Sequence, residues 1–388
     1  MRVVARINVA AIERNVTRLL GRVGPGTAIC AVVKADGYGH GAVPAARAAV
    51  AGGATWLAVV TAAEATALRD GGIDARLLVL GPLRDDDLPE ALDAGAEVVV
   101  WDAEGVERLE RLGRPADVHV KLDSGMGRLG QRDADEALAL CDRVAAAAHL
   151  RLSGAMTHFA TADAPDDLYA DQLARFTAWA ADVRRRHPSA VLHAANSAAL
   201  LRDPASHFDL VRPGIAIYGL DPMNHDAADH DLEPALEWHT RLAAVKPLLP
   251  GESVGYGRRF RAAEETTVGT ASAGYADGVR RALTNTGTAL VGGRRRPITG
   301  TVSMDSIGID LGPGATDRAG DRVVLVGRDG DEHLSAEEVA RTLGTINYEI
   351  TCGIGPRVPR VHHRDGAPVP AAGPPVDRAA RSGGTTAR

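Results

Sequence analysis

Two hydrophobic patterns alternate along the chain up to about residue 220. Short apolar runs, typical of buried strands, are followed by longer stretches with apolar residues three and four positions apart, typical of amphipathic helices. Eight strands are expected, from residues 29–33 to residues 210–218. Strands that alternate with helices across short connections favour an α/β fold of the (β/α)8 type, a TIM barrel, over an open doubly wound sheet. We expect this barrel to cover residues 8–230.

The pattern changes after residue 230. Short β-type segments, separated by glycine and other turn residues, predict a mainly antiparallel β domain over residues 233–363. Residues 2–7 alternate in the same way, so we expect them to join that sheet. Proline, alanine, glycine and serine dominate residues 364–388, which predicts a disordered tail.

Composition limits the kinds of partner. The chain has 388 residues, 45% of them hydrophobic, and a net charge of −6. No basic patch is evident, so nucleic acid and anionic membrane are poor candidates and a small soluble ligand is favoured. The apolar runs are shorter than the roughly 20 residues of a membrane helix, and no signal peptide is recognised, so we expect a cytoplasmic protein.

The three cysteines are Cys30, Cys141 and Cys352. Their odd number and wide spacing argue against a disulfide framework and against a zinc site. We expect reduced, mostly buried thiols and no metal.

The first expected strand ends at Lys34, and three glycines follow within a few residues. Partial desolvation at a strand end would lower the pKa of this lysine and give a nucleophilic amine suited to Schiff-base chemistry. The glycine-rich loop would let backbone N–H groups approach a phosphate. A lone lysine at a strand end is usually a solvated charge, but the glycine spacing and Tyr38 favour the chemical interpretation.

Other polar side chains lie at or just after the ends of later strands. They are Lys121, Asp123, His158, Asn196, Ser197 and Arg212. Because the carboxyl ends of barrel strands meet at one end of the barrel, this distribution predicts one shared site.

Residues 125–130 fit the pattern G-x-G-x-x-G, which is typical of dinucleotide binding. Here the pattern follows the fifth strand rather than the first, and no acidic strand end comes about 20 residues later. We therefore reject the dinucleotide interpretation. The glycine turn could instead aim Arg128 at a carboxylate, although an isolated arginine here would be interpreted as a surface residue.

His158 and Arg212 each have more than one interpretation. His158 could be a metal ligand, a base or a packed histidine, and the lack of a second histidine at ligand spacing favours a hydrogen-bonding or structural role. Arg212 lies within an apolar strand, so it needs hydrogen-bond acceptors or a buried ion pair. Gly214 and Ile215 could offer N–H groups to a phosphate, and Tyr275 is a turn residue unless the fold brings it to Lys34.

Taken together, these motifs resemble those of the alanine racemases. The match runs from about Arg2 to Arg360, and its segments follow in order: 34–41, 121–130, 157–161, 196–199, 211–220, 274–278, 304–305 and 345–349. The resemblance implies a homodimeric racemase that uses pyridoxal 5'-phosphate to interconvert L- and D-alanine. It also implies a role in supplying D-alanine for peptidoglycan.

The resemblance also implies roles for individual residues. Lys34 would bond to the cofactor and serve the D-alanine face, while Tyr275 from the other subunit would serve the L-alanine face. The cofactor would also be held by Tyr38, His158, Asn196, Ser197, Arg212, Gly214 and Ile215, with Arg212 at the pyridine nitrogen. Arg128 and the other subunit's Met304 would hold the substrate carboxylate. Carbamylation of Lys121 would add a negative charge that orients Arg128.

One residue departs from the pattern. Many relatives carry a tyrosine where this chain has Pro356. A wider pocket follows as a hypothesis, with side chains larger than methyl tolerated. A broader amino-acid racemase therefore remains an alternative. A related decarboxylase is disfavoured because the Tyr275 and Met304 motifs match the racemase pattern, and a non-catalytic cofactor-binding protein is disfavoured because it would not need the second domain.

Overall fold

The computed structural model describes residues 2–369, and within them it separates into two compact units. The barrel unit contains residues 20–37 and 45–213. The sheet unit contains residues 2–19, 38–44 and 214–368. Two of the boundaries between the units, at 37/38 and at 213/214, lie within segments that the sequence analysis assigned to a single site. Each unit is described by itself below.

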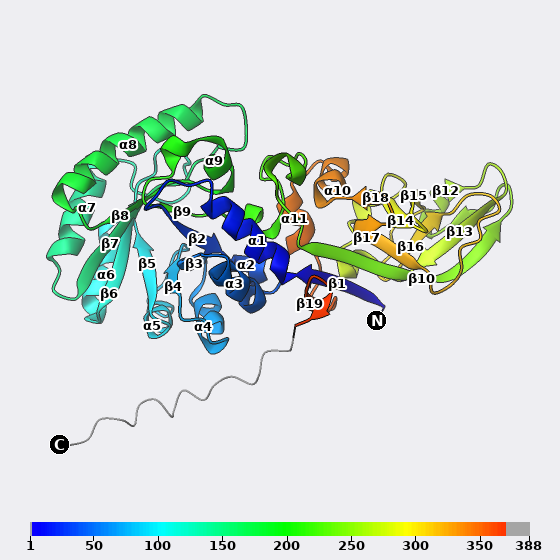
Figure 1. The fold of residues 1–388 in the computed structure, drawn as a ribbon, viewed down its shortest axis with the longest axis horizontal. Helices are drawn as coiled ribbons and strands as arrows, with labels where there is room; N and C mark the ends of the chain where they lie inside the picture. Colours follow the sequence, from blue (N-terminus) through cyan, green and yellow to red (C-terminus); the bar gives the residue numbers. More distant parts are fainter. Residues whose placement is uncertain (1, 370–388) are drawn as a thin grey trace, which may run out of the picture. The chain divides into compact units, whose positions relative to one another are not determined.

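The barrel unit is built on a closed ring of eight parallel strands (Figure 1). In ring order they are β2 (Ala28–Val32), β3 (Trp56–Val59), β4 (Arg76–Val79), β5 (Ala96–Val100), β6 (Ala116–Lys121), β7 (Leu150–Met156), β8 (Val191–His193) and β9 (Leu210–Val211). Most of their residues are buried, as expected for strands covered on both faces. The predicted eight-stranded barrel is confirmed.

Helices follow the strands and cover the ring. They are α3 (Ala42–Ala51), α4 (Ala62–Asp70), α5 (Leu88–Asp93), α6 (Ala103–Leu112), α7 (Ala134–Ala146), α8 (Leu168–Arg186) and α9 (Ser197–Arg202). Local sequence sets several starts. Thr61 and Glu64 form a reciprocal capping box at α4, while Asp102 and Asp133 cap α6 and α7.

The sheet unit is a ten-stranded, mainly antiparallel sheet. Its strands are β1 (Val3–Asn8), β10 (Leu236–Leu248), β13 (Thr266–Ala271), β14 (Thr288–Val291), β15 (Arg294–Thr299), β16 (Ile307–Asp310), β17 (Arg322–Asp329), β18 (Glu332–Leu334), β19 (Arg360–Arg364) and β20 (Ala367–Pro368). The long strand β10 pairs with β1, β13 and β17. Strand β1 also pairs in parallel with β19, so the prediction that residues 2–7 join this sheet is confirmed.

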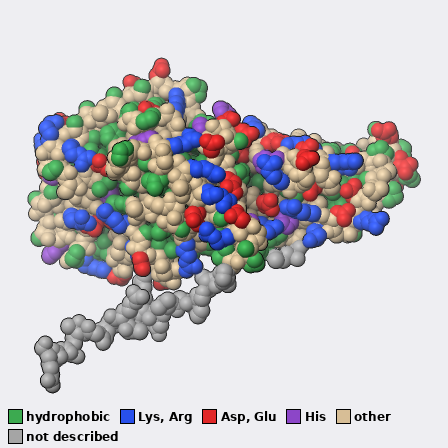
Figure 2. Space-filling view, in the orientation of Figure 1, with side chains coloured by type: hydrophobic (Ala, Val, Ile, Leu, Met, Phe, Trp, Pro, Cys, Tyr) green, Lys and Arg blue, Asp and Glu red, His purple; other side chains and the backbone are tan. Residues whose placement is uncertain are grey.

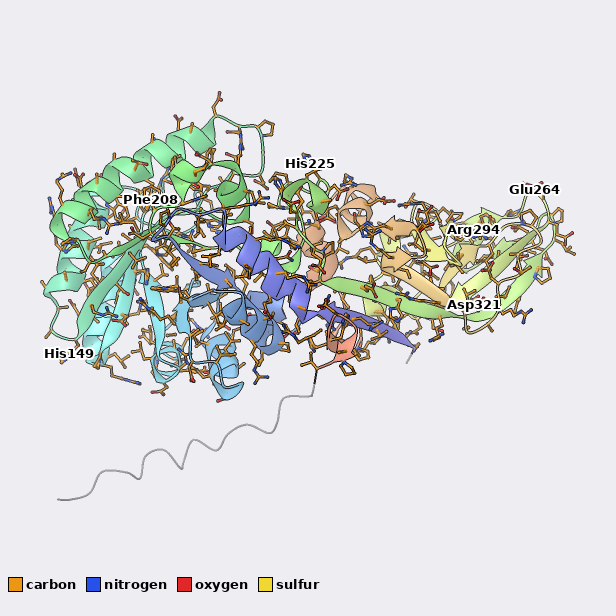
Figure 3. The ribbon with its side chains drawn as sticks, viewed as in Figure 1. His149, Phe208, His225, Glu264, Arg294 and Asp321 are labelled. Carbon is orange, nitrogen blue, oxygen red and sulfur yellow. The ribbon has the colours of Figure 1, made fainter. Side chains whose placement is uncertain are left out.

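The sheet unit also contains several short 3-10 helices and a two-stranded sheet of β11 (Ser253–Val254) and β12 (Phe260–Arg261). Its α-helices include α1 (Val9–Leu20), α10 (Ala336–Leu343) and α11 (Asn347–Cys352). In Figure 3, Glu264 marks the turn after β12 and Arg294 marks the start of β15.

Two predicted segment boundaries differ from those in the structure. The last barrel strand was expected over 210–218, but β9 stops at Val211 and Ile215–Tyr218 forms a 3-10 helix. Pro213 has no N–H group for a strand ladder, which explains the early end. The tail was expected from residue 364, yet Arg364 ends β19 and Ala367–Pro368 pairs with it as β20. Residues 370–388 lie outside the described part of the chain.

The segment after β2 is not a simple glycine loop. Lys34–Tyr38 forms α2, a turn in which Ala35 and Asp36 have φ of 51° and Tyr38 has φ of 53°. Left-handed backbone costs an L-residue about 1–2 kcal/mol. This strained turn carries Lys34 at its start and Tyr38 at its end.

The surface shows no concentration of one charge on the face seen in Figure 2, where acidic and basic side chains are interspersed. Among residues 2–369, no helix is long and apolar enough to cross a membrane. Cys30 and Cys141 are buried, as expected, whereas Cys352 is exposed, and none of the three forms a disulfide within residues 2–369.

Candidate active site

Positive charge gathers at the carboxyl end of the barrel. Lys34 follows β2, Lys121 ends β6, and Arg212 follows β9. Lys121 and Arg212 are buried, at 5% and 3% exposure, while Lys34 is half-buried. Burial, together with the charges of Arg212 and Arg128, lowers the pKa of Lys121 to about 8. About a tenth of this amine is therefore uncharged at pH 7, far more than for an ordinary lysine.

His158 lies within this group of cations. Burial, and then the charges of Arg212, Lys121, Arg128 and Lys34, hold the pKa of its imidazole well below the ordinary value. Its Nδ1 faces Arg212 Nη2 at 3.3 Å, and a guanidinium can only donate, so Nδ1 accepts. His158 is thus a neutral hydrogen-bonding residue, and no group of potential metal ligands was found in the described part of the chain.

Among residues 2–369, Arg212 has no carboxylate as a hydrogen-bond partner. It donates to the backbone oxygens of Thr157 at 2.7 Å and Ala194 at 2.9 Å, and to His193 Nδ1 at 2.9 Å. Burial lowers the pKa of its guanidinium to about 10, so it remains charged at neutral pH. The acceptors that the sequence required are therefore carbonyls and imidazoles rather than an ion-pair partner.

The glycine turn after β6 is held by Asp123. Its carboxylate accepts N–H groups of Gly125 at 3.1 Å and Gly127 at 3.0 Å. The two ends of the loop are closed by hydrogen bonds from Asp123 N to Gln131 O and from Gln131 N to Lys121 O. The N–H groups of Gly125 and Gly127 are thus occupied within the loop, and α7 begins only at Ala134. Arg128 is exposed on this loop.

Asn196 and Ser197 lie at the start of α9. The Asn196 side chain accepts the N–H of Ala199 at 3.0 Å and so caps the helix. Its oxygen therefore has a structural partner already. Ser197 is buried, with 3% exposure, as the first residue of α9.

In the sheet unit, Tyr38 lies against Gly214. A Cβ on Gly214 would lie 2.3 Å from the Tyr38 hydroxyl, so only glycine allows this approach. Tyr38 also packs on Tyr218 with ring centroids 5.2 Å apart, and burial raises its pKa. Ile215, fully buried, begins the 3-10 helix that follows.

Tyr275 and Met304 are neighbours on the sheet unit. Tyr275 N donates to Ser303 O at 2.9 Å, and Ala276 N donates to Met304 O at 3.1 Å. A Cβ on Gly274 would lie 2.3 Å from the Met304 oxygen, so the two loops touch through backbone. The side chains of Tyr275 and Met304 remain 44% and 51% exposed, which is unusual for large apolar groups.

Asp277 fixes the Tyr275 turn and was not singled out from the sequence. Its buried carboxylate accepts the N–H of Gly274 at 2.9 Å and the Nε of Arg357 at 2.8 Å, and it also pairs with Arg2. These donors hold the Asp277 pKa below its usual value against the opposing effect of burial. Only its place two residues after Tyr275 could have suggested it.

Pro356 lies beside the same turn. The neighbouring Gly355 donates its N–H to Asp277 O at 3.0 Å, and a Cβ on Gly355 would lie 2.7 Å from Ala276 O. Pro356 itself is exposed. The chain that carries it is thus held against the Tyr275 turn by backbone contacts.

The sequence analysis also missed a buried polar group inside the barrel. Glu97 on β5, His119 on β6 and His193 on β8 are all almost fully enclosed. Isolated polar residues within apolar strands were their only signal. Their side chains connect to Arg212 through hydrogen bonds.

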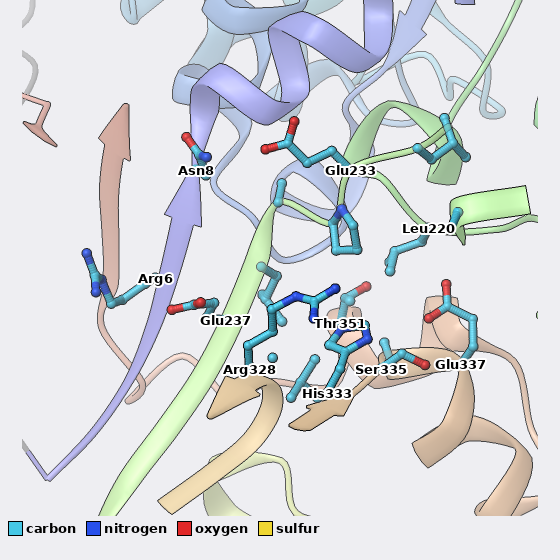
Figure 4. A pocket seen from close by; sticks show the side chains of 18 of the residues that line it. Arg6, Asn8, Leu220, Glu233, Glu237, Arg328, His333, Ser335, Glu337 and Thr351 are labelled. Atoms are coloured by element: carbon cyan, nitrogen blue, oxygen red, sulfur yellow. The ribbon is translucent and has the colours of Figure 1, made fainter. Parts of the chain in front are cut away.

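A cavity of about 620 Å³ lies elsewhere, within the sheet unit. Figure 4 shows Arg328 and His333 on one side of it and Glu233 on the other. None of the candidate site residues lines it.

These features define a class of protein. A closed parallel barrel has its chemistry at the carboxyl ends of the strands, and here that end carries two lysines and a buried guanidinium. The same chain adds an antiparallel sheet that presents an exposed tyrosine. The class is a two-part barrel enzyme whose cationic site suits an anionic ligand and amine chemistry.

Comparisons with known proteins specify the family. A model of the alanine racemase N-terminal domain matches residues 7–222, and one of the C-terminal domain matches residues 235–362. An alanine racemase of Symbiobacterium thermophilum is 42% identical over 364 residues, which cover 92% of this chain and 96% of that protein. This chain belongs to the alanine racemase family and is therefore an isomerase.

Solved structures of alanine racemases are also similar to this chain. The alanine racemase from D-cycloserine producing Streptomyces lavendulae has a TM-score of 0.89 at 38% identity, covering 94% of this chain and 97% of that one. The alanine racemase from Bacillus anthracis with bound L-Ala-P has a TM-score of 0.87 at 38% identity, covering 95% and 97%.

Proposed function

We propose that this chain interconverts L- and D-alanine with pyridoxal 5'-phosphate, as a homodimer whose sites are shared between subunits. Family membership supports the reaction, and the Bacillus anthracis relative, whose structure carries L-Ala-P, supports an alanine-like ligand. The observation that carries the proposal is the group formed by Lys34, Arg212 and the neutral His158 at the carboxyl end of the barrel.

The donor set fits such a cofactor. Lys34 provides a half-buried amine for an aldehyde, Arg212 provides a donor that keeps its proton, and Ser197 provides a buried hydroxyl. The close approach of Gly214 to the Tyr38 hydroxyl leaves a backbone surface without a side chain, which suits a phosphate. We assign the phosphate to Tyr38, Ser197, Gly214 and Ile215. Asn196 also caps α9 through its side-chain oxygen, and its expected contact with the cofactor stays part of this proposal.

The cofactor, when bound, supplies an electron-accepting ring that makes the substrate α-proton acidic. Arg212 would donate to the ring nitrogen and would keep its own proton, because its pKa stays near 10. Electron withdrawal by the ring is therefore weaker than with a carboxylate partner. This favours return of the proton over side reactions.

Two bases move the proton. Lys34 Nζ holds it on the D-alanine face, and the hydroxyl of Tyr275 holds it on the L-alanine face. The exposed Tyr275 and Met304 of one subunit would complete the site of the other, which accounts for two large apolar side chains left at the surface.

Arg128 and Lys121 orient the substrate. Arg128 binds the substrate carboxylate, and the lowered pKa of Lys121 favours its carbamylation. In that reaction a bond forms between Lys121 Nζ and the carbon of CO2, and one proton is released to solvent. The resulting negative charge would pair with Arg128.

A broader amino-acid specificity is the second candidate, because Pro356 lies next to the Tyr275 turn. We also propose a cytoplasmic location and a role in supplying D-alanine for peptidoglycan, as the family resemblance implies.

Proton exchange tests the function. In deuterated buffer with pyridoxal 5'-phosphate, the wild-type chain should exchange the α-proton of both alanine enantiomers. Tyr275→Phe should lose mainly exchange from L-alanine. Tyr256→Phe is the matched control, since Tyr256 is also exposed, at 76%, in a turn of the sheet unit. Wild-type protein that binds the cofactor but exchanges no alanine proton would rule out this function.

A further inference from the structure

A continuous chain of side chains crosses the barrel interior to Arg212. Glu97 Oε2 lies 2.9 Å from His119 Nε2, and His119 Nδ1 lies 2.8 Å from His193 Nε2. His193 Nδ1 then lies 2.9 Å from Arg212 Nη1. These four side chains come from β5, β6, β8 and the segment after β9, and all are buried, at 4% exposure or less.

The direction of every hydrogen bond in this chain follows from the two ends. A guanidinium only donates, so His193 Nδ1 accepts and its proton is on Nε2. His193 Nε2 then donates to His119 Nδ1, which places the His119 proton on Nε2. That proton is donated to the Glu97 carboxylate, which only accepts. Both imidazoles are therefore neutral, with the same tautomer.

Charge supports this arrangement. Burial, and then the charge of Arg212, hold the pKa of His193 well below its ordinary value, so it stays neutral. The Glu97 pKa is lowered although burial opposes it, because His119, Ser153 and Arg76 donate to or face its carboxylate.

The other groups that face the chain add no competing negative charge. Arg76 Nε donates to Glu97 Oε1 at 2.7 Å and stacks on Trp56, and Ser153 also donates to Glu97. Cys30 lies near Arg212, and burial raises the pKa of its thiol to about 12. Within the barrel unit, Arg212 has no carboxylate as a direct partner. Along the row of hydrogen-bonded side chains, Glu97 is therefore the nearest negative charge to Arg212.

We propose that Glu97 is a positioning residue for Arg212, acting through two neutral histidines to fix the guanidinium where it meets the ring nitrogen. The inference rests on the proposed role of Arg212 toward the cofactor. An ordinary buried polar network that only joins strands is the competing explanation, and buried ion networks often contribute little to stability.

The first test is Glu97→Gln in the full chain, measured as the dissociation constant of pyridoxal 5'-phosphate after the bound cofactor is removed. A glutamine has only one side-chain oxygen, so it can accept from Arg76 or from His119 but not from both. Its NH2 group then faces the other donor. We expect cofactor binding to weaken about tenfold or more, as for loss of a hydrogen bond to a charged group. Glu337→Gln, which removes another carboxylate at 1% exposure, in the sheet unit, should leave binding within about twofold.

The route through Arg212 is tested by a double-mutant cycle. If Glu97 acts through Arg212, Glu97→Gln should add little further loss of cofactor affinity in an Arg212→Lys background. Additive losses would overturn the proposal. Cofactor binding unchanged in Glu97→Gln, with a melting temperature lowered as in Glu337→Gln, would also overturn it and would favour the purely structural network.

A second measurement uses the wild-type chain, so it does not depend on the folding of a variant. Nitrogen-15 spectra of the histidine rings in the cofactor-free wild-type chain should show His119 and His193 neutral, protonated at Nε2 and bare at Nδ1. A proton on Nδ1 of either ring, or a charged imidazole at neutral pH, contradicts the proposal. The two proposals fail separately: wild-type protein that binds no cofactor contradicts the proposed function, whereas the ring tautomers are measured without cofactor.

Discussion

Arg212 and Asp277 are both buried charged side chains, and the structure gives each a different kind of partner. Arg212 is surrounded by carbonyls and imidazoles, so its charge stays available to a ligand. Asp277 is neutralised by Arg2 and Arg357, so it serves as an anchor for the turn that carries Tyr275. The type of residue alone does not distinguish these roles.

Replacing Asp277 should loosen the Tyr275 turn. Asp277→Asn leaves two arginines, 39% and 40% exposed, facing a neutral amide. Loss of hydrogen bonds to a charged group then costs about 1.5–3 kcal/mol of unfolding free energy. We expect such a loss in chemical denaturation, together with slower exchange from L-alanine. Asp305→Asn, which removes the exposed partner of Arg357, should cost at most about 1 kcal/mol.

The difference in unfolding free energy between wild type and Asp277→Asn should depend on pH. The Asp277 pKa is lowered in the folded chain, so its contribution is fully present above the unfolded value of about 4. It is lost as the pH falls through the lower folded value. An equal difference throughout the acid range would show that the charge of Asp277 is not the cause.

Pro356 controls side-chain specificity if the pocket hypothesis is right. We expect Pro356→Tyr to lower the racemisation rate of L-serine relative to L-alanine, because a ring would fill space beside the Tyr275 turn. The ratio of kcat/KM for L-serine to kcat/KM for L-alanine measures this change in specificity. An unchanged ratio would mean that this position does not set specificity.

At the scale of elements, α2 stands out because it places Lys34 and Tyr38 on a left-handed turn. Ala35, Asp36 and Tyr38 all have positive φ although none is glycine. The turn is supported by Glu64 of α4, whose carboxylate accepts the N–H of Ala35 at 2.7 Å. Strain of this kind persists only where surrounding contacts determine the backbone, and it often occurs at functional sites.

The strain can be measured with one substitution made at two places. Ala35→Gly removes a Cβ from left-handed backbone, so it should leave the unfolding free energy unchanged or raise it by up to about 1 kcal/mol. Ala67→Gly, at an exposed position in the right-handed helix α4, should lower it by about 1 kcal/mol. Equal losses in both variants would show that α2 stores no strain.

At the scale of the whole molecule, the proposed catalytic residues are divided between the two units of the chain. Lys34 and Arg212 belong to the barrel unit, and Tyr275 and Met304 belong to the sheet unit. Large exposed apolar side chains next to each other favour contact with another molecule. In a symmetric dimer, one such contact would occur twice.

Shared sites predict complementation between inactive variants. Lys34→Ala and Tyr275→Phe should each be nearly inactive in racemisation. Co-expressed in equal amounts, they should recover about a quarter of wild-type activity, because about half the dimers are mixed and each restores one of two sites. No recovery in a purified mixed dimer would mean that both residues act within one chain.

The sequence alone determined the barrel, the antiparallel sheet and the place of β1 in that sheet. Periodicity carries this information, because strand and helix repeats differ and parallel strands need helical crossovers. It also indicated Lys34 and Arg212 as chemical residues, since a lysine at a strand end and an arginine in an apolar strand both need explanation. The motif order was enough to indicate the family.

Only the tertiary structure decided how these residues are held. The left-handed turn of α2, the early end of β9 at Val211 and the capping role of Asn196 depend on local backbone geometry. The chain from Glu97 to Arg212 joins residues more than one hundred positions apart, and its proton directions follow only from the contacts in the folded structure. A sequence pattern shows which groups are buried, but hydrogen-bond partners are set by the fold that brings distant strands together.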